Sequence, residues 1–241
     1  MYSKVLCSLM LFILLAVGVA SAENQVDVTS GVDFVNRYVW RGLDIANTPS
    51  IQPSLAVNYS GLELGTWGAY TLSNEASDAD EIDFWLTYSR SLEDGVYFSA
   101  TIIDYYFPNS GVKLFNFNNY DAPDPGAHTL EVGLSITGPA SFPVTVSGYM
   151  NVHNDAGNNT YFQLDYPVRI GASDMSFFVG GTGGSEDNSG YYGTDDLQVI
   201  NIGMTAAREI EFTDKFSLPT NVSLIVNPMA EISYLVVSIS L

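Results

Sequence analysis

Eight charged residues of the sequence stand at alternate positions inside otherwise apolar segments. In 26–41, valines and aromatic residues fall on one face, while Asp33, Arg37 and Arg41 share the other. A charge inside a protein needs water or an opposite charge, because burying it alone is strongly unfavourable. Such residues predict either a water-filled passage or a network of internal ion pairs. They are Asp33, Arg37, Arg41, Glu63, Asp83, Glu131, Asp165 and Arg169.

The residue types give little support to catalysis. Hydrolysis uses a histidine beside a nucleophile or paired with a carboxylate. The two histidines are His128 and His153, and Asp155 lies two residues after the second. Neither has a Gly-x-Ser-x-Gly neighbourhood, and no cysteine or histidine spacing is typical of a metal site. We therefore expect no enzymatic activity and no bound cofactor.

The segments that carry these charges alternate with period two, which indicates β-strands. In 82–89, apolar residues occupy the even positions, and Asp83, Thr87 and Ser89 the odd ones. The 26–41 segment exceeds the usual strand of about 5–6 residues. It reaches the roughly 9–11 residues that cross a membrane with the apolar face outward. Twelve strands are predicted: 26–41, 51–59, 62–72, 82–89, 96–107, 129–137, 144–152, 161–170, 175–184, 197–206, 216–226 and 231–241.

The connections between these strands alternate in length. Tight turns of Gly, Asp and Ser chemistry occur at 60–61, 91–95 and 171–174. Longer polar loops separate them at 42–50, 73–81, 108–128, 153–160 and 185–196. Short turns at one end and long loops at the other are typical of outer-membrane barrels, with the termini on the periplasmic side. The sequence predicts one all-β, antiparallel transmembrane barrel of twelve strands over about 26–241.

Two points stay open at this level. In 96–107 and 197–206, apolar residues fall on both faces, so the orientation of these strands is ambiguous. A soluble sandwich or lipocalin-like barrel would show the same alternation with its apolar face inside. Strand length, abundant aromatic residues and the last strand favour the membrane. That strand alternates apolar residues up to Leu241, as in the signal read by the barrel-assembly machinery, although Phe is the usual last residue there.

The amino-terminal segment predicts export. Lys4 precedes an apolar stretch over 5–19, and Ala20-Ser21-Ala22 follows it. This is the pattern of a cleaved signal peptide, and the stretch is shorter than the roughly 20 residues of a membrane-spanning helix. We expect a signal peptide at 1–22 and a mature barrel domain at 23–241. The mature chain would carry seven basic against 27 acidic residues, which disfavours nucleic-acid binding.

A resemblance to a known family is carried by the segment Asn36-Arg37-Tyr38-Val39-Trp40-Arg41-Gly42-Leu43-Asp44. With 49–52, 61–67, 81–84 and 105–108, it resembles the opening of the TorF-type porin family, a bacterial outer-membrane family of unknown function. The likeness covers roughly the first third of the mature chain. It implies an outer-membrane barrel and a pore, but it carries no substrate and no catalytic residue.

The predicted function is passive diffusion of small polar solutes through an outer-membrane porin. Five acids against three bases among the inward residues would favour cations. The alternative is a non-conducting structural or adhesive barrel, since twelve strands lie between filled eight-stranded barrels and open barrels of 16–18 strands. The expected partners are outer-membrane lipid and lipopolysaccharide, the barrel-assembly machinery and small polar solutes.

Acidic residues also gather in the long polar loops. Carboxylates could hold Ca²⁺, but none of these groups matches the spaced calcium-loop pattern. We interpret them instead as a solvated acidic rim that faces lipopolysaccharide and its divalent counterions, and we expect no metal site. The residues are Asp78, Asp80, Glu81, Asp121, Asp124, Glu186, Asp187, Asp195 and Asp196.

Overall fold

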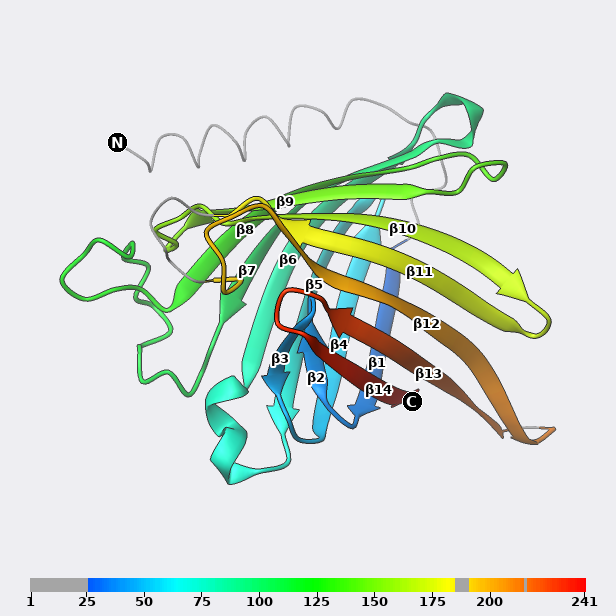
Figure 1. The fold of residues 1–241 in the computed structure, drawn as a ribbon, viewed down its shortest axis with the longest axis horizontal. Coiled ribbons are helices and arrows are strands. Elements are labelled where there is room, and N and C mark those ends of the chain that lie inside the picture. The colour runs from blue at the N-terminus through cyan, green and yellow to red at the C-terminus, as the bar shows by residue number, and fades with distance from the viewer. Residues whose placement is uncertain (1–25, 185–190, 215) are drawn as a thin grey trace.

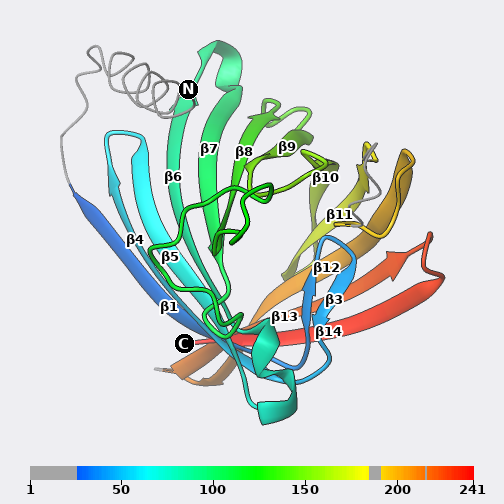
Figure 2. The same ribbon diagram turned by 90° about the vertical axis from the view of Figure 1, so that its left-hand side faces the viewer.

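The computed structural model describes residues 26–184, 191–214 and 216–241. The expected signal peptide, and Glu186 and Asp187 of the acidic loops, lie outside these residues. Within them, twelve antiparallel strands close into a barrel in which β1 pairs with both β14 and β4 (Figures 1 and 2). The barrel strands are β1 (Asp27–Val35), β4 (Ser50–Tyr59), β5 (Leu62–Thr71), β6 (Glu81–Ser91), β7 (Tyr97–Tyr106), β8 (His128–Thr137), β9 (Thr145–His153), β10 (Thr160–Ile170), β11 (Ser173–Thr182), β12 (Gln198–Thr213), β13 (Phe216–Asn227) and β14 (Ile232–Ser240).

The twelve predicted strands correspond one to one with these barrel strands, but the first prediction is too long. Strand β1 ends at Val35 rather than Arg41. The Asn36 side chain accepts from the Val237 amide at 2.7 Å and donates to the Leu235 carbonyl at 3.2 Å. It therefore takes the place of a further ladder bond to β14. Strand β12 is longer than predicted and continues to Thr213.

The residues after Asn36 form a separate two-stranded hairpin, where the sequence predicted the end of a strand and then a loop. It consists of β2 (Tyr38–Trp40) and β3 (Leu43–Ala46), which pair with each other and not with the barrel ladder. Figure 2 faces the end with the long loops and shows this hairpin within the outline of the barrel.

Short turns and long loops lie at opposite ends, as predicted. Figure 1 shows the 107–127 loop and the 3-10 turn η1 (Asn74–Ala79) at one end, and the turn between β10 and β11 at the other with the carboxyl terminus. A second 3-10 turn, η2 (Glu93–Gly95), connects β6 to β7. None of the helical turns in the described residues is long or apolar enough to cross a membrane.

The two faces of the barrel wall differ in polarity. The outer face exposes large apolar side chains, among them Leu64 at 63% and Leu134 at 59%. The inward-facing positions include Glu131, which is 1% exposed. This polarity is inverted relative to a soluble barrel, which keeps its apolar face inside. The fold is therefore compatible with an outer membrane.

A β-bulge accounts for the ambiguous pattern in 197–206. Gly180 pairs with Asn201, but Gly181 pairs with Val199, so Ile200 is an extra residue in β12. The extra residue reverses the alternation of the strand at this point. Ile200 is fully buried against Tyr161 and Tyr192, whereas Val199 and Ile202 are exposed on the outer face.

Candidate functional site

The hairpin tip, Arg41-Gly42, determines what lies in the barrel lumen. Both residues have positive φ, 49° and 79°, as a two-residue type I′ turn requires. Such a φ is unusual for a residue other than glycine, and residues held in this way concentrate at functional sites. At Gly42, an added Cβ would lie 2.0 Å from the carbonyl oxygen of Ile200, so only glycine fits against β12.

The Arg41 guanidinium is held by a carboxylate on the opposite wall. Its Nη1 and Nη2 donate to the two carboxylate oxygens of Glu131, at 2.6 and 2.8 Å. Nη1 also contacts the Tyr192 hydroxyl oxygen at 2.6 Å, and the Tyr105 hydroxyl donates to Glu131 at 2.8 Å. Bidentate, charge-assisted pairs of this kind are among the strongest hydrogen bonds in proteins. Burial by itself lowers the pKa of Arg41, but the hydrogen bonds to Glu131 together with the electrostatic attraction of Tyr192, Glu131 and Tyr105 outweigh it, and the pKa is raised.

Three aromatic rings complete the cage around this guanidinium. The Arg41 Cζ atom lies 4.3 Å from the ring centre of Trp40, 4.4 Å from that of Tyr149 and 4.5 Å from that of Tyr161. Tyr149 lies flat on the wall because its cross-strand neighbour is Gly133, where a Cβ would come within 2.5 Å of the ring. Sequence reasoning missed the cage, since its rings come from three separate segments.

Other residues of the hairpin contact several strands of the barrel wall. The Tyr38 hydroxyl donates to Glu81 on β6 at 2.8 Å, and its ring packs edge-on against Trp67 on β5. The Asn227 side chain on β13 donates to the Gly42 carbonyl at 3.1 Å. The hairpin therefore crosses the lumen near the loop end and contacts distant strands of the wall.

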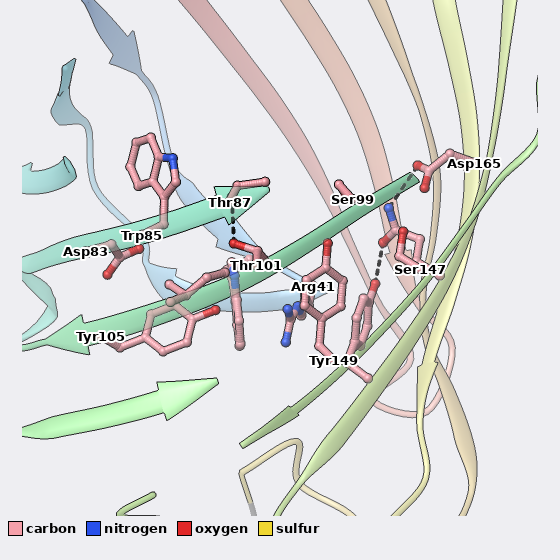
Figure 3. Close-up of a pocket in the computed structure, with 14 residues that line it drawn as sticks. Arg41, Asp83, Trp85, Thr87, Ser99, Thr101, Tyr105, Ser147, Tyr149 and Asp165 are labelled. Atoms are coloured by element: carbon pink, nitrogen blue, oxygen red, sulfur yellow. Dashed lines mark hydrogen bonds between the residues drawn. The ribbon is translucent and has the colours of Figure 1, made fainter. Parts of the chain in front are cut away.

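Beside the hairpin tip lies a cavity of about 550 Å³, shown in Figure 3. Hydroxyl side chains line much of its wall, and those of Thr87 and Thr101 hydrogen-bond to each other at 2.7 Å. Asp83 and Asp165 also line it and lie on different sides in the figure. The cavity is thus polar and carries two carboxyl groups.

The eight residues predicted to line a lumen fall into different places. Arg37 and Arg41 do not lie on β1, because both belong to the segment that turns inward after Asn36. The prediction that they share one face of the first strand with Asp33 is therefore wrong. Arg37 pairs with Asp44 of its own hairpin at 3.2 Å. Arg41 and Glu131 meet across the lumen, and Asp83 and Asp165 share the cavity.

Three of the predicted residues lie apart from this constellation. Asp33 accepts a hydrogen bond from the Ser240 hydroxyl at 2.5 Å, across the β1–β14 pair. Glu63 accepts from the indole nitrogen of Trp85 at 2.8 Å. Arg169 lies 3.6 Å from Asp174 at the short-turn end, and its side chain is 72% exposed.

Acidic and histidine side chains in and beside the long loops form hydrogen bonds and ring contacts that hold these loops in place. Asp80 accepts from the Thr71 amide at 2.8 Å and from the Asn109 side chain at 3.0 Å. His128 lies 2.8 Å from Asp104 and stacks on Phe117 of the 107–127 loop. Across 26–184, 191–214 and 216–241, no three His, Cys, Asp or Glu side chains are arranged to hold a metal ion.

The chain matches a known protein family over most of its length. The model of a family described as "Bacterial protein of unknown function (Gcw_chp)" matches residues 19–217. It does not confirm the resemblance to the TorF-type family, which stays a prediction. No curated protein matches the chain.

Proposed function

This chain belongs to the Gcw_chp family of bacterial proteins of unknown function, and we propose that it is an outer-membrane channel for small polar solutes. The observation that carries the proposal is the polarity of the closed barrel. Apolar side chains such as Leu64 and Phe84 are exposed outward, while carboxyl, hydroxyl and amide groups line the inside. Outer-membrane barrels that pass solutes combine an apolar outer band with a polar interior.

The hairpin is the constriction of this channel. It crosses the lumen near the loop end, as the inward contacts of Arg41 and Tyr38 require. Glu131 and Asp44 are neutralised by Arg41 and Arg37, whereas Asp83 and Asp165 face the cavity without a cationic partner among the described residues. The remaining field along the passage is negative, which favours cations.

The competing function is a non-conducting barrel that acts through its loops. The Arg41–Glu131 pair favours this alternative, because it bridges two sides of the lumen. Both functions use the same fold, so conductance separates them.

In planar bilayers under a salt gradient, we expect the purified protein to conduct with a reversal potential on the cation side. The double substitution Asp83→Asn and Asp165→Asn should move that potential towards zero, because it removes the unpaired charges of the cavity. The matched control is Glu93→Gln with Asp94→Asn in the exposed β6–β7 turn, where salt screens the charge. Absence of conductance would favour the non-conducting barrel.

The orientation in the membrane gives a separate test. At the hairpin end, Arg37 and Arg41 belong to the hairpin and are held in ion pairs, whereas the 107–127 loop carries the exposed Lys113. Trypsin added to intact cells should therefore cut after Lys113. Arg90 and Arg169, at the short-turn end, should be cut only after the outer membrane is permeabilised. Cleavage at those arginines in intact cells, with Lys113 intact, would show that the barrel is inverted.

A further inference from the structure

The lumenal cavity contains a buried carboxylate oxygen that lacks a hydrogen-bond partner. Oδ1 of Asp83 is inaccessible to solvent and has no partner among the described residues, while the same carboxyl group hydrogen-bonds to the Glu81 carboxyl beside it. Asp165, also on the cavity wall, accepts a hydrogen bond from the neutral Gln163 amide at 2.9 Å. A buried carboxylate is costly without a counter-charge. The nearest guanidinium in the cavity, Arg41, is already engaged by both oxygens of Glu131.

An indole ring beside Asp83 offers its face to the same cavity. Trp85 is two residues along β6, on the same side of the strand, and both line the cavity. Its cross-strand neighbour is Gly65, where an added Cβ would lie 2.1 Å from the indole ring. The ring therefore lies flat on the wall, and its nitrogen is anchored to Glu63 at 2.8 Å. The opposite face of the ring is left towards the lumen.

The surroundings of Arg41 show how this lumen binds a cationic group. Arg41 presents a guanidinium to one carboxylate and three aromatic faces, at 4.3 to 4.5 Å. The cavity beside it repeats those elements, a carboxylate at Asp83 and an aromatic face at Trp85, without an internal cation. Cations over an indole face are stabilised by the ring quadrupole, most strongly where water is excluded.

We propose that this cavity is a binding site for a small organic cation of the alkylammonium class. The charged group lies between the Asp83 carboxylate and the face of Trp85, and Asp165 adds to the negative field from the other side. The volume of about 550 Å³ is in the range of small-molecule sites, roughly 300–1,000 Å³. This assignment rests on the proposed channel and names the solute class that the channel selects.

Calorimetric titration of the folded, detergent-solubilised barrel tests the site. The probes are choline and its neutral isostere 3,3-dimethyl-1-butanol, compared at constant ionic strength so that general screening is equal. We expect choline to bind at least tenfold more tightly than the isostere. Asp83→Asn and Trp85→Phe should each weaken choline binding by about tenfold, since one removes the charge and the other the stronger π face. Asp174→Asn, at the exposed short-turn end, should leave it unchanged.

The outcomes separate the site from the channel, because binding is measured without a bilayer. Equal binding of choline and the isostere, or unchanged choline affinity in folded Asp83→Asn and Trp85→Phe proteins, would overturn the site even if the barrel conducts. Choline binding that depends on both residues would support the site even in a barrel that proves closed. Gel mobility of unboiled protein shows that each variant is folded.

Discussion

Arg41→Ala should raise the single-channel conductance several-fold, because it removes the contact that holds the hairpin tip across the lumen. The substitution deletes both hydrogen bonds to Glu131 and leaves that carboxylate, 1% exposed, without its cation. Breaking a buried ion pair from one side costs about 3–5 kcal/mol. Since each 1.4 kcal/mol is about tenfold in an equilibrium constant, the hairpin would spend far more time away from the wall. Single-channel recording in planar bilayers measures the effect.

Two further variants test whether the Arg41–Glu131 pair is responsible. Arg37→Ala removes an arginine whose partner, Asp44, belongs to the same hairpin, so it should leave the conductance near that of the native protein. Adding Glu131→Gln to Arg41→Ala removes the unpaired charge, and it should recover part of the stability lost in the single variant. If Arg41→Ala had the conductance and the stability of the native protein, the Arg41–Glu131 pair would not be what holds the hairpin across the lumen.

Arginine at Leu64 or Phe84 should prevent or severely slow assembly into a bilayer. Both side chains are exposed on the outer face, at 63% and 44%. An arginine on the lipid-facing side of a barrel costs roughly 2–4 kcal/mol near the midplane. A loss of this size is a large part of the stability of an ordinary domain, about 5–15 kcal/mol. The folded fraction in lipid vesicles, read from the mobility of unboiled protein, should fall sharply.

The neighbouring inward residues provide the matched controls. Glu63→Gln keeps an oxygen that accepts from the Trp85 indole, and Asp83→Asn changes a residue of the polar cavity. Neither places a charge in hydrocarbon, so both should assemble like the native protein. Equal tolerance of all four substitutions would show that the outer face does not meet lipid.

Much of the barrel could be predicted because period two is a local property. Each strand shows its two faces in its own residues, so twelve strands, their order and the alternation of turns and loops follow from the sequence. In 197–206, where the local pattern was ambiguous, a bulge was responsible. The bulge places the apolar Ile200 on the inward face of β12. There the backbone of Ile200 lies against Gly42, which is 158 residues earlier in the chain, and no local pattern could show this contact.

The sequence by itself determined that charged and apolar residues occupy opposite faces of long strands. Only the tertiary structure decided what the arginines do. Alternation continues unbroken through 26–41 because β1 and β2 are both extended, so the change of direction at Asn36 leaves no mark on the pattern. At this change of direction, the Asn36 side chain accepts a hydrogen bond from the Val237 amide of β14. The position of Arg41 depends on its ion pair with Glu131, on the far side of the lumen. Contacts between residues so distant in sequence arise only when the barrel closes, and closure places Arg41, expected on the wall, at the tip of a hairpin that reaches into the lumen.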